Sequence, residues 1–216
     1  LAMGRKVPFS FSESQNKSKV AFLTLVSESR QQALALARHY HNWHKLEEAF
    51  DQARYTSERE LNQLKLTTQQ IERFQKILSC LLYPHPALRA DSDILAENQQ
   101  GQEGLWPFAI SGDYPLLLVL IDDQEDIALV NELLDAHAYW RNRNIKIDLV
   151  ILNTRDVGYS QELHNRLHQL LTRRREETWL NRRGGIFVLN ADRMNKDQRR
   201  LLETVARVII DPHHGG

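Results

Sequence analysis

The stretch Leu116-Leu117-Leu118-Val119-Leu120-Ile121, followed at once by Asp122-Asp123, decides the fold of this chain. All six residues are apolar, whereas a strand with one face in water alternates apolar and polar residues. The run therefore predicts a strand that is covered on both faces, as in a parallel sheet. Asp123 is of a residue type that caps helices, so we expect a helix to follow over residues 124–142.

The rest of the C-terminal half repeats this alternation of strand and helix. Apolar runs predict further strands at residues 146–152, 185–189 and 207–210, and apolar residues at helical spacing predict helices at 160–173 and 195–205. Crossover helices return consecutive strands to the same direction. The four strands and three helices therefore predict an α/β fold with a small parallel sheet.

The N-terminal half follows a different pattern. Residues 5–11 and 19–25 carry apolar residues at alternate positions around a polar stretch, which predicts one β-hairpin. A lone hairpin is marginally stable in water, so we expect its sheet to continue outside this chain. The predicted organisation is a β-hairpin at 1–28, a helical linker region at 29–98, a Trp- and Gly-rich connecting loop at 99–115 and an α/β domain at 116–216.

The composition is that of a folded globular protein. The 216 residues are 42% hydrophobic, and 28 basic side chains balance 28 acidic ones. The basic residues lack the density and aromatic interleaving of a nucleic-acid surface, so we expect no nucleic-acid partner. The longest apolar run is far shorter than the roughly 18 residues of a membrane span. Cys80 is the single cysteine, which excludes an internal disulfide.

Polar residues follow each predicted strand. They are Asp122, Asn153, Asn190 and Asp211. The carboxyl ends of parallel strands share one edge of the sheet, where open α/β folds place ligands, so Asp122, Asn153 and Asn190 are candidates for binding a small anionic ligand. Asx side chains also cap helices and shape turns, and this structural interpretation is favoured.

The sequence offers no constellation that points to catalysis. No strand is followed by a glycine-rich phosphate-binding motif, and no serine lies in a GxSxG turn. His164 and His168 lie four residues apart and could share a metal ion, but no third ligand has a fixed spacing to them. We therefore expect no catalytic residue, no bound metal and no cofactor.

The connecting segment from Gly101 to Pro115 is unusually rich in Gly, Pro and aromatic residues. Trp106 could form a platform on which a sugar stacks, with Glu103, Ser111 and Asp113 taking hydrogen bonds from its hydroxyl groups. Alternatively, the segment plugs the junction between the helical region and the sheet. We expect the plug, because apolar residues surround Trp106 in the sequence.

The same segment resembles a known family. The runs Leu82–Arg89, Leu105-Trp106-Pro107-Phe108 and Ile110-Ser111-Gly112-Asp113 are similar to a region of cyclic β-1,2-glucan synthases, and the resemblance extends over most of the chain. It implies a piece of a large inner-membrane protein that builds β-1,2-glucan from UDP-glucose. It also implies a cytoplasmic, cellobiose-phosphorylase-like region, in which this chain lies between β-sandwich portions.

The resemblance carries no catalytic residue onto this chain. It implies a non-catalytic structural or glucan-contacting segment whose partners are other domains of the same polypeptide and β-1,2-glucan. The competing hypothesis is a free-standing α/β domain that binds a small anionic ligand at the carboxyl edge of its sheet.

Overall fold

The computed structural model describes residues 20–155 and 157–213, and the chain divides into two units, Leu1–Glu60 and Leu61–Gly216. In the first unit, helix α1 spans Arg30–His39 and helix α2 begins at Trp43 and runs to Leu64. Described residues 20–27 belong to no helix or strand. The first strand of the predicted hairpin, residues 5–11, lies outside the described residues, so the hairpin stays a prediction.

The second unit contains a four-stranded sheet. Its strands are β1 (Leu116–Ile121), β2 (Asp148–Asn153), β3 (Ile186–Asn190) and β4 (Val208–Ile210), in the order β3-β2-β1-β4. All neighbouring strands are parallel. The predicted α/β fold with a small parallel sheet is therefore confirmed. The bounds of β1 are as predicted, and those of the other strands differ from the predicted ones by at most two residues.

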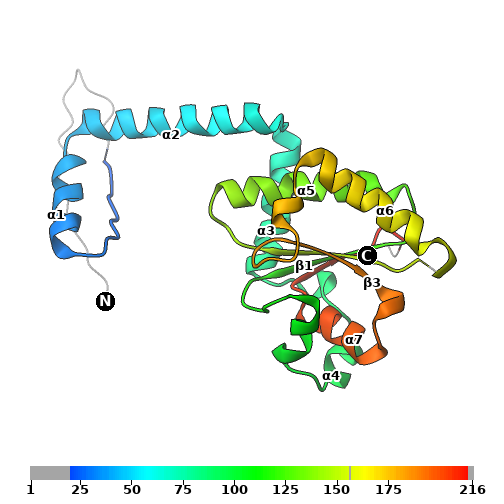
Figure 1. Ribbon diagram of the computed structural model, residues 1–216. Helices are drawn as coiled ribbons and strands as arrows, with labels where there is room; N and C mark the ends of the chain where they lie inside the picture. The colour runs from blue at the N-terminus through cyan, green and yellow to red at the C-terminus, as the bar shows by residue number, and fades with distance from the viewer. Residues whose placement is uncertain (1–19, 156, 214–216) are drawn as a thin grey trace. The chain divides into compact units, whose positions relative to one another are not determined.

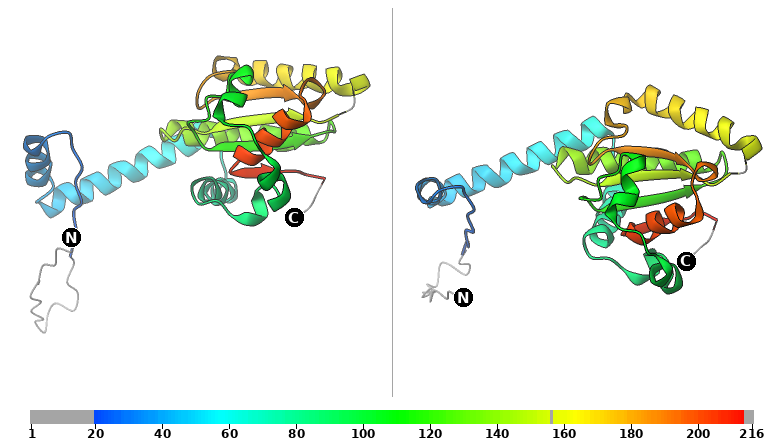
Figure 2. Two further views of the ribbon diagram at one scale, coloured as in Figure 1. Left: turned by 90° about the horizontal axis from the view of Figure 1, so that it is seen from below. Right: turned by 60° about the horizontal axis from the view of Figure 1, so that its bottom comes forward.

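Three helices connect the strands. They are α5 (Asp126–Asn142), α6 (Val157–Arg174) and α7 (Lys196–Val205). Figure 1 shows α5 and α6 on one side of the sheet and α7 on the other, and both views of Figure 2 agree. The chain passes from β1 to β2 and then to β3 through α5 and α6 on one face of the sheet. It then passes through α7 on the other face to β4, which lies on the opposite side of β1 from β2. The direction of winding therefore changes between β1 and β4.

The side chains of β1 enter two separate cores. Leu117, Val119 and Ile121 pack in one core with residues of α5, of α6 and of α3, which spans Thr68–Leu82. Leu116 and Leu118 pack in the other with α7 and with the 3-10 helix η2, which spans Gln102–Phe108. Alternate residues of a strand point to opposite faces, so the continuous apolar run supplies both cores.

Local sequence signals set several helix starts. Thr67 and Gln70 form the predicted capping box at the start of α3, and Asn195 and Gln198 form another at the start of α7. The start predicted for the helix after β1 is wrong by two residues. Asp123 accepts the backbone N–H groups of the next two residues in a turn, and α5 begins at Asp126.

Short elements link α3 to β1 and bring β3 and α7 into place. These are η1 (Pro86–Leu88), α4 (Ser92–Glu97), η3 (Glu177–Trp179) and η4 (Ala191–Arg193). In this linking region, α4 packs beside α7, and η1 packs beside β4. Leu105 and Ile110 of the same region enter the core that contains α7.

Buried polar groups hold the amino end of the sheet together. His137 of α5 lies with its Nε2 3.0 Å from the carbonyl oxygen of Ile147 and its Nδ1 3.1 Å from Arg141 Nη1. Arg141 also donates to Glu176 at 2.8 Å, a largely buried ion pair. Burial, reinforced by the charge of Arg141, lowers the pKa of His137 to about 4. The neutral imidazole therefore serves as a structural link between α5 and β2.

Asp148, the first residue of β2, is fully buried. Its Oδ1 accepts the backbone N–H of Gly184 at 2.7 Å, which ties the start of β2 to the turn before β3, while its Oδ2 has no hydrogen-bond partner among the described residues. Burial raises the pKa of Asp148 to about 6, although the Gly184 N–H and the Arg183 charge act in the opposite direction.

Replacing Asp148 with Asn should change how stability depends on pH. The folded state of the native chain holds its Asp148 proton up to about pH 6, whereas the unfolded chain releases it near pH 4, so this group lowers stability as pH rises between those values. Asp148→Asn keeps an oxygen for the Gly184 N–H and removes the buried charge. We expect the unfolding free energy of the Asp148→Asn chain to exceed that of the native chain by about 1–2 kcal/mol at pH 8. At pH 4 we expect no such gain.

Urea unfolding at a series of pH values measures this difference. Asp91→Asn is the matched control, because Asp91 is exposed and makes no side-chain capping hydrogen bond. A stability difference between the Asp148→Asn and native chains that is the same at pH 4 and pH 8 would contradict the prediction.

Candidate functional site

The carboxyl edge of the sheet brings the predicted polar residues into one row. The register pairs Ile121 with Asn153 and Asn153 with Asn190, so Asp122 follows directly beside them. Both asparagines are buried. Asn153 Oδ1 accepts the backbone N–H of Arg155 at 3.1 Å, which is a turn-shaping role. The three candidate residues therefore share an edge, but Asn153 serves the local backbone there.

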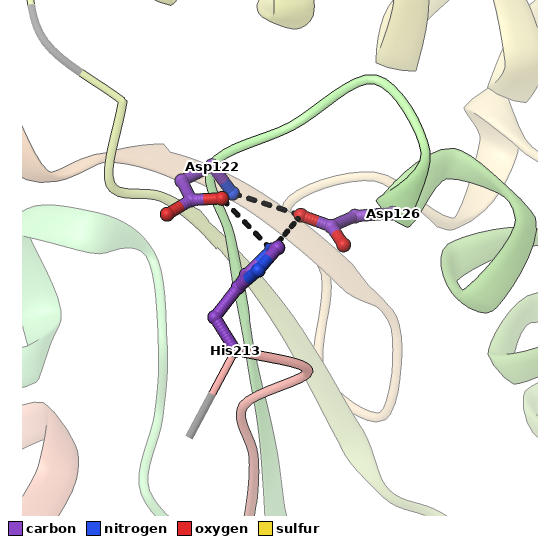
Figure 3. A group of neighbouring side chains, drawn as sticks. All are labelled: Asp122, Asp126 and His213. Atoms are coloured by element: carbon purple, nitrogen blue, oxygen red, sulfur yellow. Dashed lines mark hydrogen bonds and ion pairs between the residues drawn. The ribbon is translucent and has the colours of Figure 1, made fainter. Parts of the chain in front are cut away.

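A cluster that the sequence did not reveal lies at the same edge. His213, beyond β4, places its Nε2 2.8 Å from Asp122 Oδ1 and 3.1 Å from Asp126 Oδ2 (Figure 3). Asp126 Oδ2 also accepts the backbone N–H groups of Asp122 and Asp123, each at 3.0 Å. The cluster joins the ends of β1 and β4, between which the winding changes direction, and doubly wound folds bind ligands at such points.

The charges of this cluster stabilise one another. Burial by itself would raise the pKa of Asp126, but the N–H groups of Asp123 and Asp122 and the His213 side chain together lower it. The hydrogen bond to Asp126 raises the pKa of His213, and the charge of Asp122 adds to this effect. The contacts of His213 with Asp122 and Asp126 thus hold the segment after β4 against the turn after β1.

The donor set of the cluster is of the type that divalent cations bind. One imidazole nitrogen and two carboxylate oxygens, from Asp122, Asp126 and His213, lie within 4.8 Å of one another. The same atoms pair with each other in the structure, and Asp126 is further engaged by the backbone. His164 and His168 of α6 have ring centroids 4.5 Å apart and belong to no such three-ligand group among the described residues.

A pocket of about 650 Å³ opens at the opposite, amino end of the sheet. We call it the amino-end pocket. It lies between η1, the connecting segment and the C-terminal end of α7. Its walls are formed by Arg89, Gln100, Gly101, Gln102, Leu105, Gly112, Asp113, Tyr114, Pro115, Leu116, Leu201, Thr204, Val205 and Arg207.

The connecting segment brings two of its four predicted sugar contacts together. Gln102 Nε2 donates to the Ser111 carbonyl oxygen at 2.5 Å and lies 3.4 Å from Asp113 Oδ1. Asp113 also forms an ion pair with Arg183. Asp113 lines the amino-end pocket, whereas Glu103 lines a separate shallow depression. Neither Trp106 nor Ser111 lines either one.

The expectation that Trp106 plugs the junction is wrong. Trp106 is 63% exposed, and its neighbour Leu105 is 1% exposed and packs against the sheet with Ile110. Consecutive residues of a 3-10 helix lie about a third of a turn apart, so η2 can bury only one of this pair. The segment does close the core, but it does so through Leu105 and Ile110.

The fold and these two ends define a small doubly wound α/β unit with an acidic cluster at one edge and a polar pocket at the other. No protein-family model matches the chain. No helix among the described residues is both long and apolar enough to span a membrane.

Comparison with characterised proteins supports the resemblance inferred from the sequence. The chain is 29% identical over 204 residues to the cyclic beta-(1,2)-glucan synthase NdvB of Rhizobium meliloti (strain 1021). The alignment covers 92% of this chain and 7% of NdvB. The chain therefore resembles a small part of a cyclic β-(1,2)-glucan synthase.

Truncating the two neighbours in η2 should give opposite results. Leu105→Ala removes a buried side chain and should cost about 2–5 kcal/mol of unfolding free energy. Trp106→Ala removes an exposed side chain and should change it by no more than about 0.5 kcal/mol. Urea unfolding of the full chain measures both, and a larger loss for Trp106→Ala would show that its ring carries the packing.

His213 should titrate above the ordinary histidine value. NMR titration should give a His213 pKa above about 6.5 that falls towards it in Asp126→Asn, because the carboxylate partner is lost. The stabilisation from this contact is present at low pH and is lost as pH rises through the folded-state pKa. Asp123→Asn is the matched control, since Asp123 contacts backbone N–H groups. Equal His213 pKa values in native and Asp126→Asn chains would refute the contact.

Proposed function

We propose that this chain is a non-catalytic segment of a cyclic β-(1,2)-glucan synthase polypeptide. The observation that carries the proposal is the similarity to NdvB, which extends over almost the whole of this chain and a small share of the relative. An aligned segment of that extent fits a structural or glucan-contacting part of a much longer chain, whose other domains are its natural partners.

The roles of the polar residues support a structural part. Asn153 and Asp123 shape the turns after two strands, and Asp148 ties β2 to the turn before β3. His137, Arg141 and Glu176 link α5 to neighbouring elements. Each of these side chains makes at least one contact that holds the sheet or a neighbouring helix in place.

The proposed surroundings follow from the resemblance. The parent protein would be an inner-membrane glycosyltransferase with a phosphorylase-like region, and this segment would lie on the cytoplasmic side of a bacterial inner membrane. Its partners would be the neighbouring domains of the same polypeptide, together with β-1,2-glucan.

The competing hypothesis is less well supported. A small anion at Asp122, Asn153 and Asn190 would approach the carboxylates of Asp122 and Asp126, which His213 only partly balances. Electrostatic repulsion disfavours an anionic ligand at this edge. We therefore favour the synthase segment.

A chimaera tests the proposal directly. The aligned segment of NdvB is replaced by this chain, and cyclic β-(1,2)-glucan is measured in cells that carry the chimaera as their only synthase. We expect glucan to be made, because the segment supplies a scaffold and the rest of NdvB supplies the chemistry. A chimaera that also carries Leu118→Asp should make none, since a charge in the core abolishes the fold.

An activity assay of the purified chain provides a second test. The chain should turn over neither UDP-glucose nor β-1,2-glucan with phosphate. Turnover that persists through repurification and is lost on substitution of a residue of this chain would contradict a non-catalytic role, whatever the chimaera does.

A further inference from the structure

Two carboxylates and one imidazole converge on a single point at the carboxyl edge of the sheet. His213 Nε2 lies 2.8 Å from Asp122 Oδ1 and 3.1 Å from Asp126 Oδ2, and Figure 3 shows the three side chains pointing toward one another. These spacings are those of adjacent ligands of one metal ion, since two bonds of about 2.1 Å at right angles place their ligand atoms about 3.0 Å apart. An ion between the three atoms therefore requires only small shifts of the side chains.

The positive charge of His213 does not balance the negative charge around it. Asp122 and Asp126 share the single Nε2 proton of the imidazole, so one negative charge remains uncompensated even when His213 is protonated. The carboxylate of Asp211 also acts on His213, which increases the excess. Asp126 is only 5% exposed, and burying a carboxylate without a full counter-charge is unfavourable. A divalent cation with a neutral imidazole as its third ligand would neutralise both Asp122 and Asp126.

The surroundings of Asp126 hold its carboxylate in place as a ligand. Its Oδ2 accepts the backbone N–H groups of Asp122 and Asp123, each at 3.0 Å, which fixes the side chain at the start of α5. Carboxylates that bind metal ions are usually held by hydrogen bonds of this kind. The side chains of Asp122 and His213 are about half exposed, so an ion can enter from solvent and keep water molecules at its remaining positions.

The mixed set of donor atoms selects the class of ion. Carboxylates by themselves suit Mg²⁺ and Ca²⁺, whereas an imidazole nitrogen favours transition-metal ions such as Zn²⁺. We propose that Asp122, Asp126 and His213 bind one divalent transition-metal ion, which fastens the segment after β4 to the turn after β1. No local spacing predicts this ligand set, because His213 lies 87 residues from Asp126 in the sequence.

Calorimetric titration of the full chain with Zn²⁺ at about pH 8, where an ordinary histidine is neutral, tests the proposal. The native chain should bind one ion at this site. Asp122→Asn and His213→Gln should each weaken that binding at least about tenfold, because each removes one ligand. Both variants should fold, since the two side chains lie at the surface. Mg²⁺ should bind at least about tenfold more weakly than Zn²⁺, because the imidazole favours the transition metal.

Matched controls separate this site from other carboxylates and histidines. Asp123→Asn removes an exposed carboxylate of the same turn and should leave Zn²⁺ binding within about threefold. Replacing His164 and His168, the neighbouring pair of α6, with Gln should also leave the ion at Asp122 in place. With Mn²⁺ as the probe, paramagnetic broadening of amide NMR signals in the native chain should centre on residues 121–127 and 211–213, which locates the ion without any variant.

Four outcomes would overturn the proposal. They are no binding by the native chain at about 1 mM Zn²⁺, equally tight binding of Mg²⁺, binding that Asp122→Asn and His213→Gln both leave unchanged, and binding that only the double variant of His164 and His168 abolishes. Excess Zn²⁺ should also raise the Tm of the native chain and not that of Asp122→Asn, because an ion that binds only the folded state stabilises it. None of these results depends on the chimaera, so the synthase segment is tested separately.

Discussion

The burial of β1 on both faces is the constraint on which the rest of the unit depends. On one face of the sheet, Leu117, Val119 and Ile121 must be buried against other elements. On the other face, the same holds for Leu116 and Leu118. Helices must therefore lie on both sides of the sheet, and α7 must cross to the side opposite α5 and α6. The reversal of winding between β1 and β4 is a direct consequence.

This arrangement gives the two ends of the sheet different chemistry. At the carboxyl end, the reversal brings the residues after β1 and β4 together, so that His213 reaches Asp122 and Asp126. At the amino end, the segment before β1 must cross the face of the sheet that α7 covers, because it completes the core on that face. Leu105 enters that core, and the space left between the segment, η1 and α7 becomes the amino-end pocket.

The two ends also differ in the side chains they present. The carboxyl-end cluster pairs internally, which suits a role in fastening the segment after β4. The amino-end pocket combines the charged side chains of Arg89, Arg207 and Asp113 with apolar walls.

The sequence by itself determined the features that depend on neighbouring residues. The run from Leu116 to Ile121 is a doubly covered strand, Thr67 with Gln70 begins α3, and the alternation after residue 116 yields a parallel sheet. Only the tertiary structure decided the strand order, the burial of Leu105 in place of Trp106, and the meeting of His213 with Asp126, 87 residues away. Helix capping and strand burial leave local patterns, whereas contacts between distant segments depend on how the layers pack, which no spacing along the chain records.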